Sequence, residues 1–335
     1  MAATIRDIKE KTGLSLATIS KYINGGHVLP ENKEKIEAAI EELHYEVNEI
    51  ARGLVTNKTK TIGIVVFRIE SLFNGTLLHY IGNILREKGY GLLICDSCDD
   101  EQIEVDNVKF LIGKKVDGIL AIPVSDNFSF LESARQRNIP VVLIDRSIKD
   151  AACDCVKIDN RNVARQAVEY LIGKHHEKIA VICSGKEYTG IERYKGFMDA
   201  MNAAGYKVPE NYYKPGMHCV EHGYESMKAL LELEERPTAV FMTNYEITLG
   251  AVMALQESKY SCPKDISVLG FDNLLLTHLV EPRMCMVVQP MQELAEKAAE
   301  IILQRIEGKA EEKPIEIVLN TQMAEGDSVR DLWEN

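Results

Sequence analysis

Two cysteines at a short spacing are the first residues in this sequence whose types could do chemistry. Cys95-x-x-Cys98 matches the spacing of a zinc-binding or redox-active pair. A zinc finger also needs a second Cys or His pair, which the sequence does not supply at a suitable distance. The apolar run that ends at Cys95 predicts a buried strand leading into a loop. We therefore expect reduced, structural thiols here.

A pair of histidines gives a second, equally weak metal signal. His218-x-x-x-His222 could place two imidazoles on one face of a helix, but Gly216 and Gly223 bracket the pair and predict a loop. No third ligand is implied. The sequence also contains no phosphate loop of the P-loop type and no serine nucleophile elbow. We therefore expect no enzyme activity, no cofactor and no metal.

Charge is distributed unevenly along the chain. The net charge of −12 falls entirely after residue 60, because residues 1–60 carry nine Lys and Arg against nine Asp and Glu. Residues 1–24 and 50–60 are basic and flank an acidic helical segment. This pattern is a weak electrostatic footprint of nucleic-acid binding, which the total charge alone would not indicate.

Local signals predict three short helices within the first 45 residues. Thr4 lies three residues before Asp7, a capping-box spacing that opens a helix, and Gly13 ends it. Ser15 predicts the N-cap of a second helix, Leu16 to Ile23, and a third helix follows. Two short helices joined by a tight glycine turn, with a third beside them, are typical of a helix-turn-helix headpiece.

From residue 61 onward, apolar runs alternate with helical patterns. Such runs predict parallel sheets covered by helices on both faces, and about 275 residues exceed one comfortable core, so we expect two similar lobes. Ligands of open parallel sheets bind at the carboxyl ends of the strands, which here means between the lobes. The predicted strands are 62–67, 91–95, 118–122, 141–144, 178–183, 239–242 and 266–271.

Several segments, in a fixed order and spacing, resemble one known family over essentially the whole chain. They are Thr4–Ile8, Gly13–Lys21, Ile23–Gly25, Ala39–Tyr45, Asn48-x-x-Ala51-Arg52-x-Leu54, Lys115–Ile119, Arg193–Phe197, Pro237–Phe241 and Gly270–Asn273. The sequence resembles the lactose/galactose-repressor (LacI/GalR) family of bacterial transcription regulators. The resemblance implies an all-α helix-turn-helix headpiece (1–47), a hinge helix and linker (48–60), and an α/β two-lobed, periplasmic-binding-protein-like sensor domain with parallel sheets (61–335).

The second helix of the headpiece would enter the major groove of DNA. Leu16 and Ala17 could contact thymine methyl groups, while Ser20 and Lys21 could hydrogen-bond to bases or phosphates. The alternative is that Leu16 belongs to the headpiece core, and we favour the groove because Ile19 already supplies an inward face. The predicted DNA-binding residues are Thr4, Ser15, Leu16, Ala17, Thr18, Ser20, Lys21, Asn24, Asn48, Arg52 and Leu54.

Residues 48–56 resemble the hinge helix of the family, which orders on specific DNA and is too short to be stable alone. Leu54 matches the leucine that wedges into the minor groove at the operator centre, where a dimer supplies two copies. The alternative for Leu54 is an ordinary linker residue, which the matching Asn48, Ala51 and Arg52 disfavour.

The resemblance also implies a small-molecule site between the lobes. A guanidinium and a carboxylate, at Arg193 and Asp272, suit the paired hydroxyls of a sugar. Tyr245 and Asn74 depart from the family pattern near this site. For Phe73, Asp145 and Arg146, a structural role at a strand or helix end remains an equal alternative. The predicted effector-binding residues are Phe73, Asp145, Arg146, Arg193, Asn244 and Asp272.

We therefore expect a sequence-specific transcription regulator, a repressor, whose binding to double-stranded operator DNA is controlled by a sugar effector. A purine or a phosphoprotein co-regulator is an alternative effector, and a solute-binding protein without a regulatory role is the alternative of another class. Only five residues follow Arg330, too few for a tetramerising heptad helix, so we expect a homodimer. No apolar run is long enough for a membrane span and no signal peptide is evident, so we expect a cytoplasmic protein.

Overall fold

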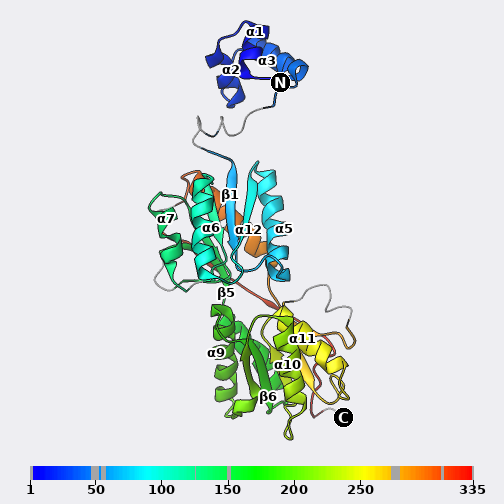
Figure 1. Cartoon of the computed structure of the whole chain (residues 1–335). Helices are drawn as coiled ribbons and strands as arrows, with labels where there is room; N and C mark the ends of the chain where they lie inside the picture. The colour runs from blue at the N-terminus through cyan, green and yellow to red at the C-terminus, as the bar shows by residue number, and fades with distance from the viewer. Residues whose placement is uncertain are drawn as a thin grey trace.

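Three parts follow one another along the chain in the computed structural model (Figure 1). A small helical headpiece, blue in Figure 1, precedes two α/β lobes that lie end to end. No helix within the described part of the chain has both the length and the apolar character to cross a bilayer. The structure describes residues 3–46, 53, 58–124, 126–148, 152–272, 280–310 and 313–333.

The headpiece folds as its local signals predict. Its helices are α1 (Ile5–Thr12), α2 (Leu16–Ile23) and α3 (Pro30–Leu43). Gly13 ends α1 with a φ of 70°, in the left-handed region where only glycine avoids a steric penalty. Ile8, Ile19 and Ile36 come one from each helix and are fully buried against one another. These three side chains form a core small enough to depend on each of them.

The lobe nearer the headpiece is built on a six-stranded sheet in the order β11-β5-β4-β3-β1-β2, with every neighbouring pair parallel. Its strands are β1 (Thr61–Val66), β2 (Gly91–Asp96), β3 (Gly118–Ala121), β4 (Val141–Ile144), β5 (Asp154–Ile158) and β11 (Glu316–Leu319). Its helices are α5 (Leu72–Glu87), α6 (Glu101–Gly113), η1 (Phe128–Leu131), α7 (Glu132–Arg135) and α12 (Met291–Ile306). We call it the N-lobe.

The second lobe, here the C-lobe, repeats this plan in the order β12-β10-β9-β8-β6-β7, with only the β10–β12 pair antiparallel. Its strands are β6 (Ile179–Ser184), β7 (Tyr213–Gly216), β8 (Ala239–Met242), β9 (Ser267–Phe271), β10 (Cys285–Val288) and β12 (Gln322–Ala324). Its helices are α8 (Asn160–Gly173), α9 (Tyr188–Ala203), η2 (Glu210–Tyr212), α10 (Val220–Leu231) and α11 (Tyr245–Gln256).

The chain crosses between the lobes after β5, after β10 and after β11. Because β5 and β10 run parallel to their neighbours, both sheets point their carboxyl ends toward the crossings. The loops that follow these strands therefore meet between the lobes, which is where the sequence predicts the ligand site.

The seven strands predicted from apolar runs are all present, within one residue at each end. The prediction missed β7, β11 and β12, which are edge strands of the two sheets. An edge strand is covered on fewer sides, so it needs no continuous apolar run. In β11, two exposed residues alternate with one half-buried and one buried residue. The short internal strands β5 and β10 were missed as well.

The sequence predicts a loop around His218 and His222. This prediction is wrong for His222, which lies inside α10. Gly223 is not a loop residue but a packing residue. A Cβ at this position would lie 2.2 Å from the carbonyl oxygen of Ile247 in α11, so glycine lets the two helices approach closely. His218 does lie in the loop before α10, and the two imidazoles bind different partners.

Candidate functional site

The exposed face of α2 is the part of the headpiece that can meet a DNA groove. Ser15 caps the helix by accepting a hydrogen bond from the Thr18 backbone N–H at 3.1 Å. Leu16 is 39% exposed and lies outside the headpiece core, whereas Ile19 is fully buried. The alternative that Leu16 is a core residue is therefore wrong. Its side chain and the exposed Ala17 present an apolar surface suited to base edges.

Other residues predicted to contact DNA are ordered by the headpiece itself. Ser20 is half-buried, and its Oγ accepts a hydrogen bond from Asn24 Nδ2 at 3.2 Å. The backbone N–H and the hydroxyl of Thr4 both donate to Asp7 Oδ2, at 2.7 and 2.8 Å, which fixes the start of α1. Lys21 is exposed, one turn beyond Ala17 on the same helix. These contacts preorganise the surface that DNA would meet.

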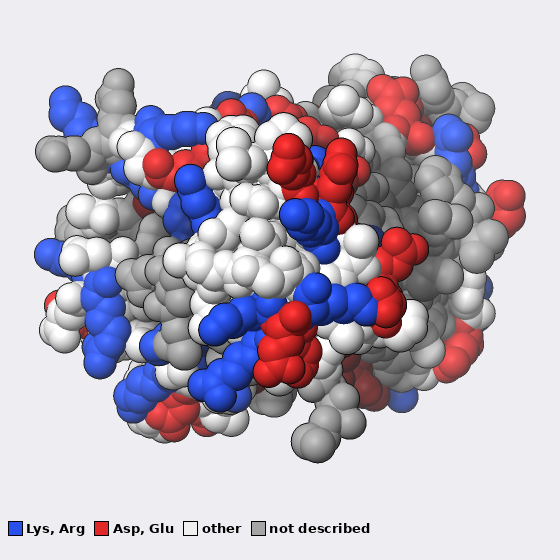
Figure 2. Space-filling model, turned by 90° about the horizontal axis from the view of Figure 1, so that it is seen from above, with Lys and Arg blue, Asp and Glu red and all other residues white. Residues whose placement is uncertain are grey.

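Basic and acidic side chains interleave on the surface seen from the headpiece end (Figure 2). Asn48, Arg52 and Leu54 lie outside the residues that the structure describes, and the DNA contacts predicted for them stay predictions.

Two buried aspartates occupy equivalent places in the two lobes. Asp145 follows β4 and Asp272 follows β9, strands that hold the same position in their sheets. Both have a left-handed backbone, with φ of 68° and 69°. Burial raises the pKa of Asp145 despite the nearby Arg146, and it raises the pKa of Asp272 to about 6 although Gln289 Nε2 donates to its Oδ1 at 2.5 Å. Buried carboxyls with raised pKa values are typical of binding sites.

Arg193 lies close to Asp272 and is itself buried, at 4% exposed. Its Nε donates to Asn160 Oδ1 at 2.8 Å and its Nη1 donates to the carbonyl oxygen of Thr243. The guanidinium also lies 3.7 Å from the ring centroid of Phe271. Arg193 therefore has a structural role in the C-lobe in addition to any contact with a ligand.

Three further residues predicted to bind the effector have contacts within the protein. Arg146 lies 3.5 Å from Glu187 across the lobes. Phe73 is buried in the apolar core beneath α5. Asn244 caps α11, since its Oδ1 accepts from the Ile247 backbone N–H at 2.9 Å. Phe73 and Arg146 thus make contacts that fit the structural role given above as their alternative.

A group of buried polar atoms near the crossings has no hydrogen-bond partner within the described part of the chain. They come from both lobes and follow β4, β5, β8 and β10 or begin α5 and α11. Leaving one such group unpaired costs about 1–3 kcal/mol, so a cluster of them indicates a place where a polar ligand binds. The atoms are Asn74 Oδ1, Asp145 Oδ1, Arg146 Nε, Asn160 Nδ2, Thr243 Oγ1, Tyr245 OH and Gln289 Oε1.

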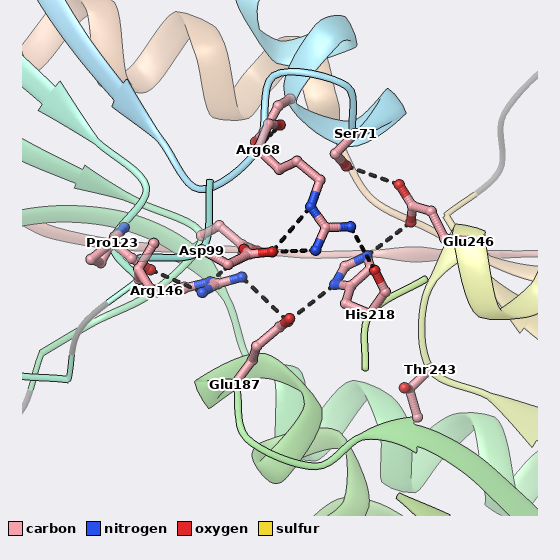
Figure 3. Close-up of polar contacts among 12 residues, drawn as sticks. Arg68, Ser71, Asp99, Pro123, Arg146, Glu187, His218, Thr243 and Glu246 are labelled. Atoms are coloured by element: carbon pink, nitrogen blue, oxygen red, sulfur yellow. Dashed lines mark hydrogen bonds and ion pairs between the residues drawn. The ribbon is translucent and has the colours of Figure 1, made fainter. Parts of the chain in front are cut away.

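The sequence analysis missed an ionic cluster between the lobes, shown in Figure 3. His218 lies between two carboxylates, with Nδ1 3.0 Å from Glu187 Oε2 and Nε2 2.8 Å from Glu246 Oε2. From the N-lobe, Arg68 donates to the His218 carbonyl oxygen at 3.0 Å and pairs with Asp99. The sequence singled out His218 only as half of a weak metal-binding pair, and nothing in it indicated the partners of this residue.

The members of this cluster hold one another in their charged forms. Burial disfavours a charged His218, but the hydrogen bonds with Glu187 and Glu246 outweigh it and raise the pKa of the imidazole to about 9. Burial also disfavours a charged Glu187, yet His218 and Arg146 lower its pKa to about 2. The pKa of Glu246 is lowered against the effect of burial by the same imidazole. At neutral pH the cluster is therefore an imidazolium between two carboxylates.

Comparison with known proteins links both ends of the chain to described families. Residues 4–48 match the model of bacterial regulatory proteins of the lacI family, and residues 168–329 match a periplasmic binding protein-like domain. Catabolite control protein A of Priestia megaterium is 30% identical over 305 residues, covering 90% of this chain and 92% of the relative.

Other relatives extend over nearly the same length. The HTH-type transcriptional repressor PurR of Vibrio atlanticus (strain LGP32) is 32% identical over 334 residues, covering 98% of this chain and 99% of PurR. The ribose operon repressor of Escherichia coli (strain K12) is 32% identical over 307 residues, covering 91% and 93%. These relatives are transcription regulators and not enzymes.

Solved structures show the same fold. A lac repressor dimer bound to operator and the anti-inducer ONPF superposes with a TM-score of 0.89 at 22% identity, covering 98% of this chain and 100% of that one. A complex of the transcriptional regulator CelR with cellobiose superposes with a TM-score of 0.74 at 26% identity, covering 97% and 99%. The helical headpiece followed by a two-lobed α/β domain is thus the fold that the sequence predicts.

Proposed function

Because the chain belongs to the LacI family and is a DNA-binding transcriptional repressor, we propose that a neutral sugar bound between its lobes controls its binding to operator DNA. The observation that carries this proposal is the group of unpaired polar atoms near the crossings. They include acceptors such as Asp145 Oδ1, a donor at Asn160 Nδ2 and a hydroxyl at Tyr245 that can do both. Each sugar hydroxyl both donates and accepts, so it can satisfy such a mixed set.

The charged groups argue against an anionic effector such as a sugar phosphate. Three arginines lie near the crossings, and each already has a partner in the protein. Arg68 pairs with Asp99, Arg146 with Glu187, and Arg193 with neutral oxygens and Asp272. A phosphate would have to displace a carboxylate that these cations already bind, whereas a neutral polyol would not.

A purine, the alternative effector that the sequence analysis leaves open, would need an open aromatic face for stacking. Two rings near the crossings are each covered by a guanidinium on one side. Arg193 lies 3.7 Å from the centroid of Phe271, and Arg146 lies 4.7 Å from that of Phe67. Phe73 is buried in the apolar core. These contacts favour hydroxyl recognition over base stacking.

We further propose that α2 reads the operator and that the chain acts as a homodimer in the cytoplasm. Two copies of α2, related by a twofold axis, would meet the two half-sites of a near-palindromic operator. Leu16 and Lys21 would contact bases, and Leu54 from each copy would wedge into the minor groove. The dimer named in the lac repressor structure supports this arrangement.

A ligand screen on the full chain tests the proposed effector class. Thermal melts would be recorded with neutral sugars, sugar phosphates and purine bases, each at millimolar concentration. A ligand at a hundred times its Kd adds about 2.7 kcal/mol to stability, a shift of several degrees. Operator fragments selected from random DNA then show whether the same ligand changes DNA affinity. A shift with purines or phosphates and none with neutral sugars would contradict the proposal.

A further inference from the structure

The first turns of α5 and α11 meet across the two lobes. Ser71, the N-cap of α5, donates through its Oγ to Glu246 Oε1 in the first turn of α11 at 3.0 Å. Each of these turns also holds a buried polar atom that has no partner among the residues that the structure describes, Asn74 Oδ1 in the N-lobe and Tyr245 OH in the C-lobe. Asn74 and Tyr245 are also the two positions near the ligand site at which the sequence departs from the family pattern.

The orientation of the Asn74 amide is fixed by the protein. Asn74 is fully buried, and its Nδ2 donates to the carbonyl oxygen of Arg68 at 2.7 Å. Only the nitrogen of an amide side chain can donate to a carbonyl oxygen, so Oδ1 must point the other way. The unpaired atom is therefore an acceptor, and it requires a ligand group that carries a proton. A hydroxyl supplies such a proton, whereas an ether or carbonyl oxygen does not.

Tyr245 is buried but lies outside the apolar core of its lobe. Ile247, Ala251 and Leu255 of the same helix belong to that core, and the helical period places Tyr245 on a different side of α11. Tyr245 is nevertheless only 2% exposed. Burial raises the pKa of Tyr245, so its hydroxyl keeps the proton at neutral pH. The hydroxyl can therefore both donate to a ligand and accept from it.

The charged group between these two turns is already paired. Glu246 accepts from Ser71 through Oε1 and faces His218 through Oε2, at 3.0 and 2.8 Å. The two unpaired atoms, an amide oxygen and a phenol hydroxyl, are both neutral. An ammonium group would bring a buried charge that these atoms cannot balance. A neutral hydroxyl matches Asn74 and Tyr245 without that cost.

We propose that Asn74 and Tyr245 form a hydroxyl-reading subsite that determines which sugar this chain accepts. Asn74 Oδ1 accepts from one ligand hydroxyl, and Tyr245 OH bonds to the same hydroxyl or to the one beside it. This inference rests on the proposed sugar effector. Because one residue belongs to each lobe, a sugar bound here contacts both lobes. A sugar without the matching hydroxyl leaves a buried polar atom unpaired, which lowers affinity roughly ten- to a hundredfold.

Isothermal titration calorimetry on the full chain tests the subsite. The neutral sugars of the thermal-melt screen, among them ribose, galactose and cellobiose, are titrated first, and the tightest binder is then compared with its single-deoxy analogues. At least one analogue should bind the unsubstituted chain roughly ten- to a hundredfold more weakly than its parent. Asn74→Leu keeps a side chain of similar size but has no acceptor. In this variant the ratio of parent to analogue affinity should fall to about one at a single hydroxyl position and stay unchanged at the others.

Two further variants separate this role from a general weakening of the site, which would leave every ratio unchanged. Tyr245→Phe should lose selectivity at the same hydroxyl position as Asn74→Leu or at the adjacent one. Asn107→Leu is the matched control, because Asn107 in α6 also donates through Nδ2 to a backbone carbonyl, that of Asp96 at 2.9 Å, and all its ratios should stay as in the unsubstituted chain.

Unchanged ratios in Asn74→Leu or in Tyr245→Phe would overturn the subsite and leave the proposed sugar effector standing. If the unsubstituted chain bound no neutral sugar of the screen, both proposals would fail.

Discussion

Replacing Tyr245 by phenylalanine removes one hydroxyl from the proposed effector site without changing the volume of the side chain. Tyr245 is 2% exposed, follows Asn244 at the start of α11, and its hydroxyl has no partner within the described part of the chain. An unpaired buried hydroxyl costs about 1–3 kcal/mol. Tyr245→Phe should therefore leave the ligand-free melting temperature unchanged or raise it by a few degrees.

The same substitution should weaken ligand binding. If the hydroxyl bonds to a sugar, its loss removes one hydrogen bond and leaves a ligand hydroxyl unpaired, about 1–2 kcal/mol in all. That corresponds to a roughly five- to thirtyfold increase in Kd, which isothermal titration calorimetry resolves easily. The prediction is thus an unusual pair of effects, equal or higher stability together with lower affinity.

Tyr212→Phe is the matched control. Tyr212 is equally buried, at 2% exposed, but its hydroxyl donates to the carbonyl oxygen of Glu235 at 3.0 Å, within the C-lobe. Its loss should lower the melting temperature by a few degrees and leave ligand affinity unchanged. Unaltered affinity in Tyr245→Phe, with the control behaving as described, would refute the assignment of this hydroxyl to the effector site.

Three further predictions concern Arg193 in the proposed effector site and the two leucines proposed to contact DNA, Leu16 and Leu54. Arg193→Ala should abolish the ligand response and also lower ligand-free stability by about 3 kcal/mol or more, because it leaves Asp272 buried without its cation. Thermal melts with and without ligand measure both effects, and retained ligand affinity would contradict this prediction. Leu16→Ala should leave headpiece melting within about 0.5 kcal/mol but reduce operator affinity, whereas Ile19→Ala should unfold the headpiece, so a stability loss in the first variant would place Leu16 in the core. Leu54→Ala should weaken binding to operator far more than to random DNA in gel-shift titrations, and equal losses on both would remove the minor-groove role.

Much of the fold could be read from short stretches of sequence, because the interactions that start and end helices are local. Ser15 caps α2 through the backbone three residues on, and Gly13 ends α1 by its own backbone freedom. Continuous apolar runs identified most of the internal strands, because burial on both faces leaves no polar side to show, although the short β5 and β10 were missed. The resemblance to the family then indicated Asp145 and Asp272 as effector-binding residues, and both follow strands at the edge of a sheet where ligands of parallel sheets bind.

The partners of the charged side chains could not be read in this way. His218 bonds to residues 31 and 28 positions away, and Arg68 reaches a carbonyl 150 positions away. The His218 pairs depend on how three loops of the C-lobe pack together, and the Arg68 contact depends on how the two lobes face each other. No periodicity in the sequence predicts either arrangement. Likewise, Gly223 predicted a loop, but in the structure it lies at the contact between α10 and α11. Sequence alone therefore determined most of the elements and the edge of the sheets where a ligand would bind. Only the tertiary packing decided which charges meet there, because a long-range ion pair forms only once both of its backbone segments are in place.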